Sequence, residues 1–187
     1  LTQSLERVRK CEDAGAGGVV LKSIFEEQIE REIEGLAAAS APALAHSEAM
    51  DYIAAYGKEN ALDDYIELVH AAKKAVRIPV IASINGVSAG GWVEYARKME
   101  EAGASALELN VYFIAADADE TGEQVERRYL DLVAAVRRAI SLPLAVKVGP
   151  YFSSMANMAR RLVEAGGDGL VLFKRVDERV SDLGVRM

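Results

Sequence analysis

The sequence RIPVIAS at residues 77–83 recurs as SLPLAVK at residues 141–147, and the second copy begins 64 residues after the first. A second signal accompanies each copy, EAGA at residues 101–104 and EAGG at residues 164–167, and EDAGA stands near the start at residues 12–16. A repeat of this length exceeds a single solenoid unit and is typical of a β-α-β-α unit that occurs twice.

Apolar runs and helical spacing alternate along the chain. Short apolar runs predict five strands, at residues 18–21, 80–84, 106–111, 144–148 and 169–173. Apolar residues at helical spacing predict helices near residues 5–11, 29–36, 62–76, 92–99, 125–140 and 155–162. Near-continuous apolar strands are buried on both faces of a parallel sheet, which leaves an open doubly wound sheet or a (β/α) barrel. The repeat favours the barrel. Since a closed barrel has eight strands, we expect an α/β fold: an incomplete (β/α)8 TIM barrel, as a single domain over residues 1–187.

Composition narrows the class of protein. The net charge of −7 argues against nucleic acid or an anionic membrane as the partner. The single cysteine, Cys11, excludes an internal disulfide framework and suits a reducing compartment. No run reaches the length of a membrane span, and the first residues do not resemble a signal peptide. We therefore expect a cytoplasmic protein, as a homo-oligomer, that acts on a small molecule.

Polar residues stand within or just after each predicted strand, where parallel α/β folds carry their ligand sites. They are Lys22, Asn85, Asn110, Lys147 and Lys174.

Lys147 is the leading candidate, because an ammonium inside an apolar strand needs an anionic or strongly polar partner. The alternative is a structural ion pair with Glu108 or Asp168. Lys22 is similar but less deep in its strand. Asn110 could donate hydrogen bonds to a planar heterocycle and accept them from it, or be a satisfied amide at a strand end.

Other features favour ordinary structural roles. Asn85 and the glycine after it could form only a turn. The glycines at residues 15–18 precede a strand, so they indicate a helix C-cap instead of a phosphate loop. Trp92 is expected in the core. His46 and His70 lack the spacing of metal ligands, so no metal site is predicted.

Five motifs follow one another along the chain: VLKS at 20–23, VIAS at 80–83, ALELN at 106–110, AVKV at 145–148 and DGLV at 168–171. In this order they resemble the dihydroorotate dehydrogenase-like family of FMN-dependent (β/α)8 oxidoreductases, which includes a domain of dihydropyrimidine dehydrogenase. The segments IFEEQI at 24–29 and GGWVEY at 90–95 add to the resemblance.

The resemblance implies a flavoprotein of pyrimidine metabolism that transfers a hydride from a C–C bond of a small heterocycle to FMN. It implies that Lys147 stabilises negative charge at the pyrimidine side of the flavin, and that Lys22 and Asn110 contact flavin and substrate. These roles agree with the residues themselves, since a cation stabilises a developing anion strongly in a dry site.

Two positions depart from the family pattern. The catalytic base is expected three positions after Asn110, where this chain has Phe113, so the catalytic residue is unknown. Lys174 stands where an asparagine is common. Two rivals therefore stay open: a non-catalytic ligand-binding or structural barrel that has lost its base, and a phosphate-binding synthase barrel, which would not need Lys147.

Overall fold

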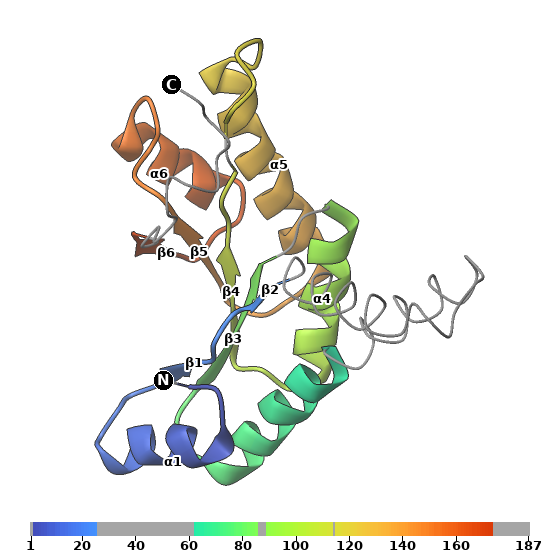
Figure 1. The fold of residues 1–187 in the computed structure, drawn as a ribbon, viewed down its shortest axis with the longest axis vertical. Coiled ribbons are helices and arrows are strands. Elements are labelled where there is room, and N and C mark those ends of the chain that lie inside the picture. Colours follow the sequence, from blue (N-terminus) through green and yellow to red (C-terminus); the bar gives the residue numbers. More distant parts are fainter. Residues whose placement is uncertain (1, 26–61, 86–88, 114, 174–187) are drawn as a thin grey trace, which may run out of the picture.

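The computed structural model describes residues 2–25, 62–85, 89–113 and 115–173 (Figure 1). The elements are α1 (Leu5–Asp13), β1 (Val19–Val20), β2 (Ile24–Phe25), β3 (Val80–Asn85), α4 (Ala89–Glu101), β4 (Ala106–Asn110), α5 (Gly122–Ala139), β5 (Leu144–Val148), α6 (Met155–Glu164) and β6 (Gly169–Leu172). A further helix covers residues 62–75. The helix expected at 29–36 lies outside the described residues.

The strands of the described residues form one sheet in the order β1-β3-β4-β5-β6, and every pair is parallel. β2 also pairs with β3, above β1: Val19 lies opposite Val80, and Ile24 opposite Ile84. β1 and β2 are thus two parts of one interrupted edge strand. The sequence predicted only the first part. The second part, Ile24–Phe25, follows the polar residues Lys22 and Ser23 and is too short to show a strand pattern. The predicted parallel α/β fold is confirmed.

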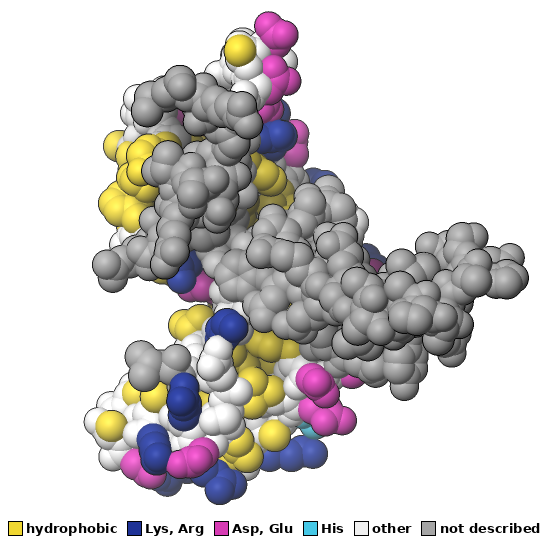
Figure 2. Space-filling view, in the orientation of Figure 1, with side chains coloured by type: hydrophobic (Ala, Val, Ile, Leu, Met, Phe, Trp, Pro, Cys, Tyr) yellow, Lys and Arg dark blue, Asp and Glu magenta, His cyan; other side chains and the backbone are white. Residues whose placement is uncertain are grey.

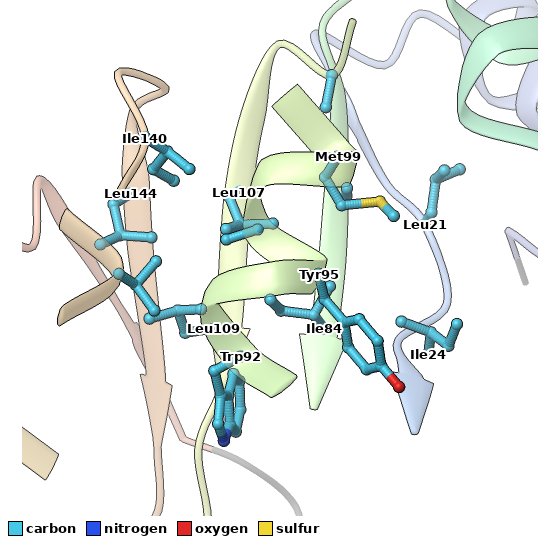
Figure 3. Close-up of a cluster of buried hydrophobic side chains, with 14 of the residues drawn as sticks. Leu21, Ile24, Ile84, Trp92, Tyr95, Met99, Leu107, Leu109, Ile140 and Leu144 are labelled. Carbon is cyan, nitrogen blue, oxygen red and sulfur yellow. The ribbon is translucent and has the colours of Figure 1, made fainter. Parts of the chain in front are cut away.

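One face of the sheet is apolar and is covered by helices. Ile84, Leu107 and Leu109 lie on this face, and Trp92 and Met99 of α4 lie against it (Figure 3). All five side chains are fully buried. Trp92 is therefore a core residue, as predicted. Because side chains alternate along a strand, the residues between these apolar positions face the opposite side, which is the interior of a (β/α) barrel.

Helices α1, α4 and α6 end in the same way. Gly15, Gly103 and Gly166 have φ of 84°, 84° and 113°, a conformation that favours glycine. At the end of α4 the Gly103 N–H donates to the Glu100 carbonyl (2.9 Å), and the Ala104 N–H donates to the Met99 carbonyl (3.1 Å). This pattern is a Schellman C-cap. The A-G signals of the sequence are thus helix ends, and the predicted C-cap at residues 15–18 is confirmed.

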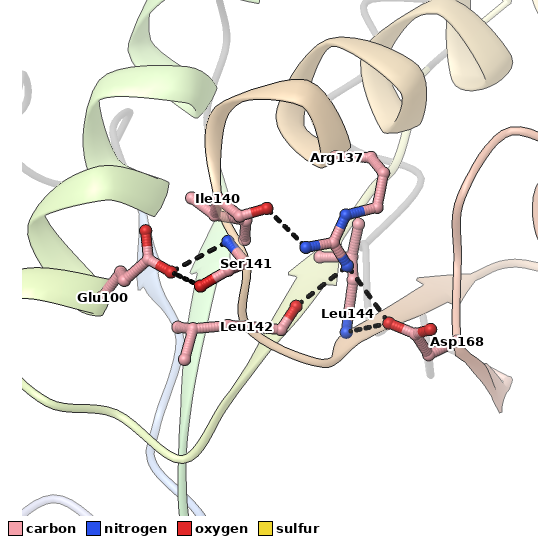
Figure 4. A network of polar contacts seen from close by, with 7 residues as sticks. All are labelled: Glu100, Arg137, Ile140, Ser141, Leu142, Leu144 and Asp168. Carbon is pink, nitrogen blue, oxygen red and sulfur yellow. Dashed lines mark hydrogen bonds and ion pairs between the residues drawn. The ribbon is translucent and has the colours of Figure 1, made fainter.

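The amino ends of the strands carry a polar clamp in the second repeat (Figure 4). The Asp168 carboxylate accepts the Leu144 N–H (2.9 Å) and a guanidinium N–H of Arg137 (3.2 Å). Arg137 also donates to the Ile140 and Leu142 carbonyls. One arginine and one aspartate therefore join α5, β5 and the turn before β6.

The first repeat carries the same clamp with different side chains. The Ser105 hydroxyl accepts the Val80 N–H (3.1 Å) and an ammonium N–H of Lys73 (2.8 Å). These three residues precede their counterparts in the second repeat by 63 or 64 positions. The sequence repeat is therefore also a repeat of tertiary contacts.

A second pair of matched contacts joins the end of a helix to the turn that precedes a strand. Glu12, near the end of α1, accepts the Arg77 N–H at 2.7 Å, and Glu100, near the end of α4, accepts the Ser141 N–H at 2.8 Å. Each glutamate occupies the same position in its Schellman cap. Hydrogen bonding by Ser141 lowers the pKa of the Glu100 carboxyl below its ordinary value.

The outer strands expose apolar side chains. Val20 on β1 is 39% exposed, and Leu172 and Phe173 at β6 are about half exposed. Figure 2 shows hydrophobic side chains at the surface in the upper and the lower half of the view. In a closed barrel both edge strands would pair with neighbours, so these side chains mark where the described sheet is open.

Candidate functional site

The interior face of the sheet is polar at the carboxyl ends of the strands. Ser83 of β3 lies opposite Glu108 of β4, and Asn110 of β4 lies opposite Lys147 of β5. Alternation places the four side chains on one face. Ser83, Glu108 and Asn110 are at most 4% exposed. Parallel pairing has therefore gathered residues from three strands into one buried polar cluster.

A chain of hydrogen bonds runs through this cluster in one direction. The Asn110 amide nitrogen lies 3.3 Å from the Ser23 hydroxyl, which lies 2.7 Å from the Ser83 hydroxyl. Ser83 donates in turn to Glu108 Oε1 at 2.7 Å. An ionised carboxylate only accepts hydrogen bonds, so Ser83 must donate to it and Ser23 must donate to Ser83. The chain thus starts at the Asn110 amide and ends on Glu108.

This direction leaves the other atom of the Asn110 amide as an acceptor. Its oxygen Oδ1 is buried and has no hydrogen-bond partner among the described residues. A buried polar atom without a partner carries a desolvation cost of about 1–3 kcal/mol. In a native site, such an atom indicates a missing donor, which a bound molecule can supply.

Lys147 lies opposite Asn110 on the neighbouring strand. Its side chain is 28% exposed, and its Nζ lies 3.6 Å from Glu108 Oε1. The alternative ion pair with Glu108 is therefore present. The Asp168 alternative is not, because Asp168 binds Arg137 and Leu144 at the opposite end of the sheet. A direct charge-assisted bond is about 2.7–2.9 Å long, so the looser contact with Glu108 leaves Lys147 donors for another acceptor.

The helix over residues 62–75 supports the cluster from behind. The Tyr65 hydroxyl accepts the Ser83 N–H (3.0 Å) and donates to the Ser83 carbonyl (3.1 Å). Burial raises the pKa of the Tyr65 hydroxyl well above its ordinary value, so it remains a donor. Tyr65 thereby holds β3 in place where Ser83 reaches Glu108.

The structure separates Lys22 from the hydrogen-bonded chain. Its side chain is exposed, and its backbone N–H contacts the Thr2 carbonyl at 3.4 Å. The neighbouring Ser23 enters the chain instead. Asn85 is the last residue of β3; Lys174 and His46 lie outside the described residues. Sequence reasoning did not propose Ser23, Ser83 or Tyr65 as site residues. Ser83 could have been proposed, because it occupies the position in the first repeat that Lys147 occupies in the second.

Phe113 lies in an aromatic cluster next to α5. Its ring meets that of Tyr129 edge-on at 4.8 Å between centroids, and its N–H donates to the Tyr129 hydroxyl at 3.1 Å. The Arg128 guanidinium lies over the Phe113 ring, with its carbon Cζ 4.6 Å from the ring centroid. The cluster borders a cavity of about 240 Å³ lined by Tyr112, Phe113, Ala115, Val125, Tyr129, Gly149, Tyr151 and Phe152. Phe113 is thus directed toward a helix, and an aromatic ring cannot accept a proton as a base would.

Metal-binding clusters and membrane-spanning helices are both absent from the described residues. No group of three or more His, Cys, Asp or Glu side chains in that part of the chain is arranged to hold a metal ion. His70 instead contacts the Ala102 carbonyl through Nδ1 at 2.9 Å. No helix in the described ranges is long and apolar enough to cross a membrane.

Comparison with known sequences points to one group of enzymes. The chain is 31% identical over 179 residues to the catalytic subunit of dihydroorotate dehydrogenase B (NAD(+)) of Thermoplasma acidophilum, covering 92% of this chain and 55% of that protein. It is 28% identical over 182 residues to PreA, a subunit of NAD-dependent dihydropyrimidine dehydrogenase of Escherichia coli K12, covering 91% of this chain and 42% of that protein. No protein-family model matches the chain. The chain spans 42% to 55% of the length of these two curated relatives.

Comparison with solved structures supports the barrel. Phosphonopyruvate hydrolase, in complex with oxalate and Mg²⁺, superposes with a TM-score of 0.55 at 18% identity, over 98% of this chain and 59% of that one. YagE of E. coli K12, of the dihydrodipicolinic acid synthase family, gives 0.52 at 15% identity, over 86% and 44%. Identities this low show the fold alone. The predicted incomplete TIM barrel and the resemblance to dihydroorotate dehydrogenases are confirmed, and the relatives' names do not favour the non-catalytic rival.

Proposed function

We propose that this chain, a homologue of dihydroorotate dehydrogenases and of PreA, forms the strand-end site of an FMN-dependent oxidoreductase acting on a C–C bond of a small heterocycle. The observation that carries the proposal is the pairing of Asn110 and Lys147. The buried Oδ1 of Asn110 needs a donor, and Lys147, opposite Asn110 on the neighbouring strand, has an ammonium whose loose contact with Glu108 leaves donors for a further acceptor. An N–H next to a C=O on one ring edge satisfies both.

A cyclic imide or ureide has such an edge, and both the flavin ring and dihydropyrimidines contain one. The residues present therefore fit FMN: Asn110 would accept from a ring N–H, and Lys147 would donate to the adjacent carbonyl. FMN, when bound, supplies the chemistry of accepting a hydride and its two electrons from the substrate. Lys147 contributes positive charge where negative charge develops, in a site largely closed to water. Lys22, exposed next to Ser23, remains a proposed contact of the same molecules.

Reconstitution with saturating FMN tests this function. We expect the intact natural protein to take up FMN with the visible spectrum of bound flavin, and Asn110→Ala to weaken that uptake. Asn157→Ala, in the exposed part of α6, is the matched control and should bind FMN normally. Anaerobic mixing with dihydroorotate, dihydrouracil and other cyclic dihydro-amides would then identify the substrate by bleaching of the flavin. Absence of flavin uptake by the wild-type protein would contradict the proposal.

A further inference from the structure

Glu108 is the buried charge at the centre of the cluster. Its side chain is 4% exposed, and within the described part of the chain it contacts the Ser83 hydroxyl and the Lys147 ammonium, both through the same oxygen, Oε1. A carboxylate removed from water is costly unless charged or polar partners compensate it. Glu108 thus depends on Lys147, and the position of Lys147 depends in turn on Glu108.

The carboxylate is held more firmly than the ammonium. Ser83 fixes Oε1 at 2.7 Å, and the Tyr65 hydroxyl bonds both the N–H and the carbonyl of Ser83. Lys147 is more exposed and has a flexible four-carbon stem. Its opposite neighbour on β4 is Asn110, whereas Glu108 lies one alternation earlier, opposite the small Ala145. The Lys147 side chain therefore leans back along the sheet toward the carboxylate.

We propose that Glu108 is a positioning residue that draws the Lys147 ammonium back along the interior face and limits the positive charge available to a bound ring. The inference rests on the proposed function, because the ring it concerns is that of FMN. Without Glu108, the ammonium would be free to approach the carbonyl of the bound ring near Asn110. It would then favour negative charge on that ring more strongly. Glu108 thereby sets how readily the site accepts electrons.

The test is the midpoint potential of protein reconstituted with saturating FMN. Glu108→Gln keeps the side chain's length and an acceptor for Ser83 but removes its charge. We expect it to shift the equilibrium about tenfold toward reduced cofactor, which is about 30 mV for a two-electron couple. In a Lys147→Met background the same substitution should shift that equilibrium by less than about twofold, because no ammonium remains to be released.

Glu126→Gln is the matched control. Glu126 also accepts from one serine and one cation, Ser153 at 2.7 Å and Arg161 at 2.5 Å, but it lies on α5, outside the strand-end cluster. Its substitution should leave the potential unchanged. If Glu108→Gln does not fold, Glu108→Asp, which withdraws the charge by one methylene, should shift the potential in the same direction by a smaller factor.

The outcomes separate the two claims. Wild-type protein that takes up no FMN would overturn the proposed function and this inference with it. Wild-type protein that binds FMN, together with a Glu108 variant whose potential is unmoved or lowered, would overturn the inference alone. An equal shift in the wild-type and Lys147→Met backgrounds would also overturn it, because Glu108 would then not act through Lys147.

Discussion

The two ends of the sheet use the same repeat in opposite ways. At the amino ends, Ser105 and Asp168 occupy matching positions, and each accepts the first N–H of the preceding strand, Val80 or Leu144. At the carboxyl ends, the repeat places Ser83 in one copy and Lys147 in the other, and these two side chains flank a single carboxylate.

The difference has a physical reason. Every β-α unit must satisfy the backbone groups where a strand begins, so both copies need an acceptor and a cation there. The carboxyl ends carry no such common requirement, and in (β/α) barrels they are where ligands bind. Repetition thus marks the part that supports the fold, and divergence marks the candidate site.

The largest effect that we predict concerns the position of Phe113. Dihydroorotate oxidation needs a base for one proton, and a positioned base contributes about 10²–10⁴-fold to the rate. Because Phe113 packs against Tyr129, we expect dihydroorotate turnover by the FMN-loaded protein to be lower by this factor than ordinary enzyme rates. Steady-state assays with dihydroorotate and an artificial electron acceptor would measure it. Turnover on the order of 10 per second would show that another residue supplies the base.

The next effect tests the repeated helix ends. Both Gly103 and Gly166 have positive φ, but a Cβ at Gly103 would meet nothing within 4 Å, whereas one at Gly166 would overlap the Arg137 side chain at Cγ. Left-handed backbone costs an ordinary residue about 1–2 kcal/mol, and forced overlap adds about 1–3 kcal/mol. Gly166→Ala should therefore lower the free energy of unfolding by more than Gly103→Ala does. Chemical denaturation of both variants measures the difference, and equal losses would contradict the structure.

The Lys147 substitution compares chemistry with support. Lys147→Met removes one charge-assisted contact worth about 1.5–3 kcal/mol, so flavin reduction should slow by about 10- to 100-fold. The companion measurement is the thermal midpoint of the same sample. Arg137→Met, at the amino end, should show the opposite pattern, a lower midpoint with flavin reduction unchanged. If Lys147→Met lowers only the midpoint, Lys147 is a structural partner of Glu108 and no more.

The smallest effect is a dependence of stability on pH. The Ser153 hydrogen bond and Arg161 lower the pKa of the Glu126 carboxyl in the folded protein. The unfolded chain then binds a proton more readily, so this stabilisation is present above the ordinary carboxyl pKa and is lost as the pH falls toward the folded value. We expect Glu126→Gln to lose less stability than wild type between pH 6 and pH 3, by at most about 1 kcal/mol. Thermal melts of both proteins across this pH range measure the difference. An equal loss of stability with falling pH in the two proteins would contradict the prediction.

Local patterns in the sequence were enough to predict the alternation of helices and strands, the repeat and the helix ends, although not the short strand β2. These depend on local signals, such as apolar periodicity and the A-G pairs around Gly15, Gly103 and Gly166, which act within a few residues of themselves. The sequence also placed Lys147 and Asn110 at strand ends, because the end of an apolar run is visible in one dimension.

The contacts between polar groups of the site could not be predicted in this way. The contact of Ser83 with Glu108 depends on parallel register between two strands, and that of Ser23 with Asn110 on residues 87 positions apart. The unpaired oxygen of Asn110 became evident only in the folded structure, because the Glu108 carboxylate sets the direction of the hydrogen bonds that run from Asn110 through Ser23 and Ser83. Register and hydrogen-bond direction are properties of packed neighbours, and neighbours distant in sequence are brought together only by the fold.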